Sequence, residues 1–128
     1  MNLDETWAAF PRLETRRLIL RPMTPRDADD HFALYSQPQV MAAHGVTPYE
    51  DVAESVALIA WYKSVFADKE AIRWGMALRG NGRLIGTCGF HNIRPKHFRG
   101  EIGFELHSTY WRQGLAYEAV GEIVRYGF

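Results

Sequence analysis

The clearest alternation of apolar and polar positions in the chain runs from Glu101 to His107. The side chains of Ile102, Phe104 and Leu106 fall on one side of this segment, and polar residues and a glycine fall on the other. A period of two over this length predicts a β-strand with one buried face. We therefore expect Phe104 and Leu106 to lie in the hydrophobic core.

After this strand the spacing of apolar positions becomes helical. An amphipathic helix is predicted because five apolar residues share one face, namely Ala116, Ala119, Val120, Ile123 and Val124. Gly114 stands at the turn between the strand and this helix.

Glycine at such a turn lets the backbone come close to a ligand. The first N–H groups of a helix have no partner inside it, and they lie at the positive end of the helix dipole. The turn at Gly114 is therefore a candidate site for a phosphate or pyrophosphate group. The alternative is a turn that needs a glycine and binds nothing.

Three further strands are predicted. The segment 16–23 alternates, and the segments 72–78 and 84–90 are strand-like and largely apolar. The connection 79–83 between the last two contains two glycines around an asparagine, which is typical of a hairpin turn. These two strands should therefore be antiparallel neighbours.

Two segments carry the start signal of a helix, with a threonine cap, a proline at the first position and a carboxylate at the third. They begin at Thr24 and Thr47, and the second helix should run to about Phe66. We expect the segment 40–46 between them to be a loop. Residues 1–12 should form a loosely held arm that docks through aromatic side chains.

The predicted order of elements is β-α-α-β-β-β-α. It indicates an α/β (α+β) chain with a mixed, mostly antiparallel sheet flanked by helices. The length of 128 residues fits one domain, 1–128, with enough chain for a sizeable core.

Composition limits the possible functions. Lysine and arginine number 15 and aspartate and glutamate number 15, so the charge gives no argument for binding nucleic acid or an anionic membrane. The single cysteine, Cys88, excludes an internal disulfide, and we expect it to be a buried, inert thiol. The histidines show no metal-ligand spacing, so no metal site is expected. The acidic N-terminus and the lack of a long apolar run favour a cytoplasmic protein.

The segment 101–120 resembles the acetyl-CoA-binding core of the GNAT acetyltransferases, in particular the RimJ/RimL-like branch of ribosomal-protein N-acetyltransferases. The segment 13–34 resembles the opening of the same branch. The resemblance covers the first part of the family's fold, and we expect its C-terminal strands to be absent from these residues. The residues that carry the C-terminal resemblance are Glu101, Ile102, Gly103, Phe104, Trp111, Gly114, Ala116, Glu118 and Ala119.

The resemblance implies a binding site for acetyl-CoA. Five residues of the turn would wrap the pyrophosphate, mainly through backbone N–H groups, namely Arg112, Gln113, Gly114, Leu115 and Ala116. The backbone of Leu106 and His107 would offer its edge to the pantetheine arm.

The higher the pKa of the acceptor amine, the more the reaction depends on a base to deprotonate it. Deprotonating a lysine amine, with a pKa of about 10.4, costs roughly 4–5 kcal/mol at pH 7, whereas an α-amine near 7.8 costs about 1 kcal/mol. Glu105 is the first candidate base, because it would project beside the thioester and burial would raise its pKa. Glu101 is the second. We expect His91 to be a hydrogen-bonded residue at the rim of the substrate channel and His107 to face solvent.

The sequence therefore predicts an N-acetyltransferase that moves an acetyl group from acetyl-CoA to a primary amine. The acceptor stays open between a protein N-terminus and a small-molecule amine. The alternative is a non-catalytic acyl-CoA-binding or protein-interaction module. In either case the edge of the last strand invites another chain, so a homo-oligomer is expected.

Overall fold

The computed structural model describes residues 3–94 and 99–127 of the chain. Its centre is a five-stranded sheet in which all neighbouring strands are antiparallel, in the order β1-β2-β3-β4-β5. The strands are β1 (Leu13–Glu14), β2 (Leu18–Arg21), β3 (Ile72–Leu78), β4 (Leu84–Arg94) and β5 (Arg99–Leu106). The expected fold class, a largely antiparallel sheet flanked by helices, is confirmed.

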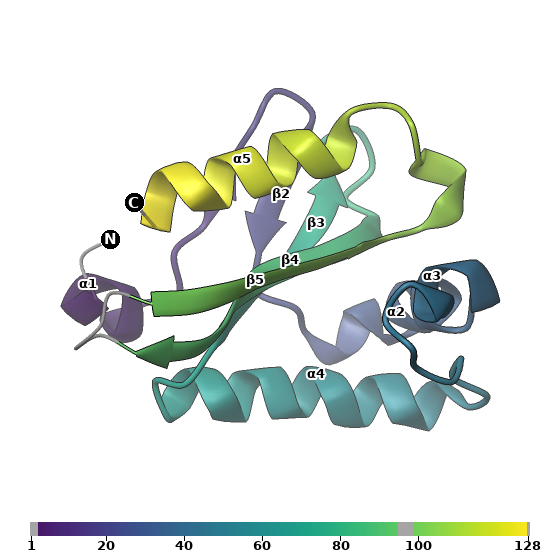
Figure 1. The fold of residues 1–128 in the computed structure, drawn as a ribbon, viewed down its shortest axis with the longest axis horizontal. Coiled ribbons are helices and arrows are strands. Elements are labelled where there is room, and N and C mark those ends of the chain that lie inside the picture. The colour runs from purple at the N-terminus through teal and green to yellow at the C-terminus, as the bar shows by residue number, and fades with distance from the viewer. Residues whose placement is uncertain (1–2, 95–98, 128) are drawn as a thin grey trace.

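The helices cover the two faces of this sheet unequally (Figure 1). Helix α5 lies alone across one face, while α2, α3 and α4 lie on the opposite face. The helices are α1 (Leu3–Ala8), α2 (Ala28–Tyr35), α3 (Pro38–Ala42), α4 (Val52–Ala67) and α5 (Leu115–Gly127), with short 3-10 turns η1 (Pro25–Asp27) and η3 (Ser108–Tyr110).

The main core lies between the sheet and α5. Leu115, Ala119 and Ile123 bury the apolar face of α5 against the strands, as the helical spacing predicts. Trp74 of β3 is fully buried there, and its indole N–H donates to the carbonyl of Pro11 at 2.7 Å. The aromatic ring is thus tied to the N-terminal segment.

That N-terminal segment is more ordered than expected, because it forms helix α1. The rings of Trp7 and Phe10 pack on Phe66, with centroids 5.2 and 5.0 Å apart, so the expected aromatic docking is confirmed. The docking buries apolar area that a loose arm would leave in water.

The helix starts agree with the sequence only in part. The capping box of Thr24 and Asp27 forms as predicted and leads into α2. The second helix begins later than predicted, because Asp51 rather than Thr47 is its cap and forms a capping box with Glu54. The segment 40–46, expected to be a loop, begins inside helix α3, which spans Pro38–Ala42.

Strand β5 is the outermost strand of the sheet, and within the described residues nothing pairs with its second edge. Leu106 is buried as expected, but Ile102 and Phe104 are 42% and 44% exposed. The prediction that Phe104 lies in the core is wrong. Leu106 lies in the same core cluster as Leu115 of α5, whereas Ile102 and Phe104 do not belong to that cluster.

Candidate active site

The turn that leads into α5 contains two residues with a left-handed backbone conformation. Gly114 has a φ of +79°, and Arg112 has a φ of +64°, a left-handed conformation that costs a residue with a side chain about 1 kcal/mol or more. The first backbone bond into the helix runs from the Glu118 N–H to the Gly114 carbonyl at 3.0 Å. The N–H groups of Leu115 and Ala116 come before this first bond in the chain, so they have no acceptor inside the helix and point out from its N-terminal end.

A clamp of polar side chains holds this turn against the start of the sheet. The carboxylate of Glu118 accepts hydrogen bonds from the Thr15 hydroxyl, from the Arg17 backbone N–H at 3.0 Å and from Arg17 Nε at 2.9 Å. Arg17 Nη1 also donates to the Gln113 carbonyl at 2.9 Å. The conformation of the turn thus depends on a residue almost one hundred positions earlier in the chain.

A groove runs from this turn along the open edge of β5. Its narrow part, about 130 Å³, lies beside Arg112 and Gly114 at the start of α5. Its wider part, about 440 Å³, continues toward the middle of the sheet. The two parts share three lining residues, Phe104, Leu106 and Trp111.

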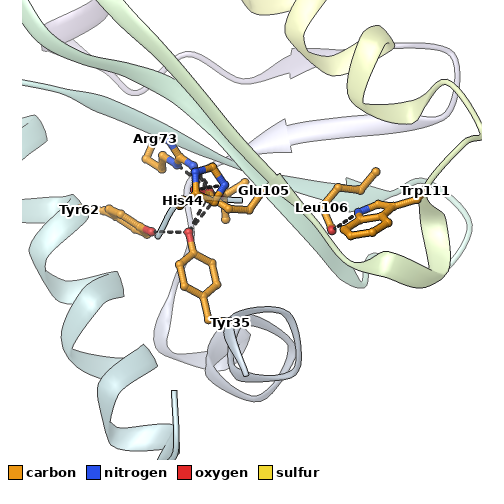
Figure 2. Close-up of polar contacts among 8 residues, drawn as sticks. Tyr35, His44, Tyr62, Arg73, Glu105, Leu106 and Trp111 are labelled. Atoms are coloured by element: carbon orange, nitrogen blue, oxygen red, sulfur yellow. Dashed lines mark hydrogen bonds and ion pairs between the residues drawn. The ribbon is translucent and has the colours of Figure 1, made fainter. Parts of the chain in front are cut away.

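The register of β5 decides which backbone groups face this groove. The His107 N–H donates to the Ile85 carbonyl at 2.8 Å, so it belongs to the sheet. By the alternation of an antiparallel pair, the N–H and C=O groups of Phe104 and Leu106 point away from β4. Trp111 folds back over this edge, and its indole N–H donates to the Leu106 carbonyl at 2.7 Å (Figure 2).

Glu105 lies at the wide part of the groove, where side chains from four other parts of the chain meet it (Figure 2). Its Oε2 accepts hydrogen bonds from the hydroxyls of Tyr35, at 3.0 Å, and Thr87, at 2.7 Å, and it forms an ion pair with Arg73. Its Oε1 lies 3.5 Å from Nε2 of His44. This carboxylate is therefore the polar centre of the site.

The groups around Glu105 lower the pKa of its carboxyl, whereas the sequence led us to expect a raised pKa. Burial raises the pKa of the carboxyl, but the charge of Arg73 and the hydrogen bonds from Thr87 and Tyr35 outweigh it, and the pKa is lowered. Burial and the Glu105 charge raise the pKa of Tyr35 to about 12. Glu105 is thus held ionised, and the expectation of a raised pKa is wrong.

The other predicted polar residues do not join this centre. Glu101 has a side chain that is 64% exposed and pairs with Nε2 of His91 at 3.0 Å, so His91 is the hydrogen-bonded rim residue that was expected. The ring of His107 accepts the Thr109 N–H at 3.2 Å and caps η3. Glu101 therefore lies in an exposed ion pair near the start of β5, whereas Glu105 lies in the buried polar centre near its end.

The sequence did not identify Tyr35, His44, Arg73 or Arg17 as site residues. Two polar residues inside apolar strands, Arg73 and Thr87, were a signal that could have been used, since a buried polar group needs a partner. The partners themselves lie 14 to 70 positions apart in the chain, so only the fold brings them together.

Three further features were considered in residues 3–94 and 99–127: a metal site, a reactive thiol and a membrane-spanning helix. No cluster of three or more histidine, cysteine, aspartate or glutamate side chains that could hold a metal ion occurs there. Cys88 is fully buried as expected, and burial raises the pKa of its thiol to about 12. None of the described helices is long and apolar enough to span a membrane.

A family model described as an acetyltransferase (GNAT) domain matches residues 17–128. The chain belongs to the GNAT acetyltransferase family. It is 41% identical over 119 residues to the uncharacterized N-acetyltransferase YoaA of Bacillus subtilis (strain 168), covering 93% of this chain and 67% of that protein. It is 35% identical over 116 residues to the uncharacterized N-acetyltransferase p20 of Bacillus licheniformis, covering 91% and 65%. The chain thus spans about two thirds of the length of these GNAT relatives.

Solved GNAT structures share the fold. A GNAT-family acetyltransferase from Bacillus anthracis superposes with a TM-score of 0.77 at 21% identity, over 92% of this chain and 66% of that one. The ribosomal-protein-S5-alanine acetyltransferase from Vibrio fischeri gives 0.67 at 20% identity, over 91% and 66%. The self-immunity acetyltransferase MccE, solved with acetyl-CoA and AMP, gives 0.75 at 14% identity, over 88% and 63%.

Proposed function

We propose that this GNAT chain transfers an acetyl group from acetyl-CoA to a primary amine. The observation that carries the proposal is the groove of two neighbouring cavities that share Phe104, Leu106 and Trp111 and lie between the turn before α5 and the buried Glu105–Arg73 pair. An extended cosubstrate with a diphosphate at one end and a thioester at the other matches this shape and polarity.

The diphosphate end would lie at the start of α5. Backbone N–H groups of the turn are the donors we propose for it, with the Arg112 side chain adding charge. The proposed pyrophosphate residues remain Arg112, Gln113, Gly114, Leu115 and Ala116. Arg17 would act on them indirectly, because it fixes the Gln113 carbonyl and the Glu118 carboxylate.

The pantetheine end would follow the edge of β5. The outward backbone groups of Phe104 and the Leu106 N–H can pair with amides of an extended arm, as an added strand would. The Leu106 carbonyl would have to exchange its bond from Trp111 to take part. We propose no cofactor contact for the His107 N–H, because the sheet already uses it.

For the acceptor we propose an amine of low pKa, such as a protein N-terminus, in line with the RimJ/RimL-like resemblance. An α-amine needs only about 1 kcal/mol for deprotonation at pH 7. A small-molecule amine is the other acceptor class. We further propose that the chain acts in the cytoplasm as a homo-oligomer of a single domain.

Two measurements test the proposal together. Calorimetry with coenzyme A should show one site per chain, and thiol release from acetyl-CoA should rise when an accepted amine is added. The amine panel should contain peptides with free N-termini, free amino acids, polyamines and aminoglycosides. Binding without turnover on any amine would favour the non-catalytic acyl-CoA-binding module. Absence of coenzyme A binding by the folded chain would overturn both functions.

A further inference from the structure

We propose that His44 is the base that removes the proton from the acceptor amine, and that Glu105 holds its imidazole in place for this step. The inference rests on the proposed function and assigns a residue that the sequence did not single out. It replaces the direct base role expected of Glu105 with a paired histidine and carboxylate.

The first step of the argument is that Glu105 is poorly suited to take the proton itself. Its Oε2 already accepts from Tyr35 and Thr87 and pairs with Arg73. Each of these donors stabilises the ionised form, and the carboxyl pKa is lowered despite burial. A carboxylate of this kind accepts a proton from an ammonium group less readily than an ordinary one does.

The second step is the position of the remaining oxygen. Oε1 of Glu105 lies 3.5 Å from Nε2 of His44, and the Glu105 side chain is only 13% exposed. An ionised carboxylate beside one ring nitrogen favours the tautomer that carries the proton there. Nδ1 of His44 is then the ring nitrogen with the free lone pair.

The third step is the access of His44 to the groove. His44 follows helix α3 in a turn that its N–H closes on the Met41 carbonyl at 3.0 Å, and the next residue, Gly45, has a φ of +65°. The side chain is 38% exposed and lines the wide part of the groove together with β5. It therefore contacts both the proposed acetyl site and solvent.

The charges around His44 leave Glu105 as its main electrostatic partner. The other titratable groups that line the same cavity are Arg73 from β3 and His91 from β4. Arg73 is paired with Glu105, and His91 is paired with Glu101. Neither competes for the Nε2 atom of His44.

In the proposed step, the amine nitrogen forms a bond to the thioester carbonyl carbon and the bond from that carbon to sulfur breaks. His44 Nδ1 takes the first proton from the ammonium form, which frees the nitrogen lone pair for this bond, and passes that proton to solvent. The second proton that the nitrogen loses on forming the amide goes to the leaving thiolate, so the reaction of an ammonium releases one proton overall. An imidazole suits this exchange because it can both accept and release a proton.

The first test compares His44→Gln with the wild-type chain. The variant should bind coenzyme A with an unchanged Kd, and its kcat with an accepted amine should fall by about 10² or more. Glu105→Gln should lose activity as well, and among preparations that circular dichroism shows to be folded the double variant should be no worse than His44→Gln alone, because the two residues act as a unit. Added imidazole should restore part of the rate of His44→Ala.

The matched comparison is His91→Gln, which removes an imidazole from the same cavity but leaves the pair intact. Its kcat should fall far less than that of His44→Gln. A His44→Gln variant that retains more than a third of the wild-type kcat would overturn the proposal, and so would additive losses in the double variant.

A second readout does not need turnover. Long-range nitrogen–proton NMR of the histidine-labelled chain should show the Nε2–H tautomer for the ring whose signals disappear in His44→Gln. The Nδ1–H tautomer would overturn the pairing. A wild-type chain that binds coenzyme A but releases no thiol with any amine would overturn the proposed function, and the tautomer would then decide the pairing alone.

Discussion

Arg73 and Glu105 meet across β4 as an ion pair in which each side chain is only 13% exposed. Thr87 of the intervening strand contacts both partners, since its hydroxyl accepts from Arg73 Nη2 at 2.9 Å and donates to Glu105 at 2.7 Å. The hydroxyls of Tyr35 and Tyr62 continue the network on the helix side, 3.1 Å apart (Figure 2). A polar centre of this kind is stable only when every member keeps its partner.

Arg73→Met should therefore destabilise the chain strongly. Removal of the cation leaves the Glu105 charge buried without its main partner, which typically costs about 3–5 kcal/mol. Urea denaturation would measure this loss. Arg79→Met is the control, because Arg79 is 43% exposed and pairs with Glu14 at 3.7 Å; exposed pairs contribute about 1 kcal/mol or less. Equal losses in the two variants would contradict the assigned role of the buried pair.

His31 should make stability depend on pH. Burial lowers its pKa from 6.5 to about 4, and its Nδ1 lies 2.8 Å from the Ser55 hydroxyl. Between these two pH values the unfolded chain binds a proton that the folded chain does not, so the free energy of unfolding should fall as the pH falls. The difference corresponds to about 3 kcal/mol. Denaturation of His31→Phe at several pH values should lack this part of the slope, and parallel curves for the two proteins would show that His31 titrates normally.

Gly114→Ala should weaken coenzyme A binding. The residue has a φ of +79°, which strains any residue with a Cβ, whereas the added Cβ would lie 3.4 Å from Arg17 Nη2, close to ordinary contact, so the backbone of the turn would be disturbed more than its clamp. We expect an affinity loss of about tenfold or more and a destabilisation of about 1 kcal/mol. Gly121→Ala is the matched control, because nothing lies within 4 Å of an added Cβ in the same helix.

Gly121→Ala should instead stabilise the chain by about 0.5–1 kcal/mol through helix propensity, with coenzyme A binding unchanged. Calorimetry and thermal unfolding of both glycine variants provide the comparison. Unchanged coenzyme A affinity in Gly114→Ala would show that the turn is not part of the coenzyme A site.

The open edge of β5 should mediate self-association when no coenzyme A is bound, because a second chain and the pantetheine arm would use the same backbone groups. Ile102 and Phe104 are exposed beside unpaired backbone groups, a combination that favours strand addition. The wild-type chain should therefore show a multiple of the monomer mass in light scattering. Phe104→Lys should shift it toward the monomer, whereas Tyr117→Lys, at a residue 86% exposed on α5, should not. A monomeric wild-type chain would refute the expected homo-oligomer.

Local patterns predicted most of the fold, because strand alternation, helix spacing and capping act over a few neighbouring residues. The strand Ile72–Leu78 and the Thr24 capping box agree with the structure. The same reasoning misplaced the next helix start, since Thr47 with Glu50 and Asp51 with Glu54 both have the spacing of a capping box, and only the structure shows that the second pair forms it. It also placed Phe104 in the core, because alternation identifies a face of a strand and cannot tell whether another element covers it.

By itself, the sequence determined the antiparallel sheet and the turn at Gly114, because these depend on spacing along the chain, and its resemblance to known sequences indicated the family. Only the tertiary structure decided the state of Glu105. It brings Arg73, Thr87 and Tyr35 to one carboxylate from different elements, and their charge and hydrogen bonds outweigh the effect of burial. It also places His44 beside that carboxylate. Electrostatic interactions depend on distance in space, so a pKa cannot be inferred from neighbours in sequence.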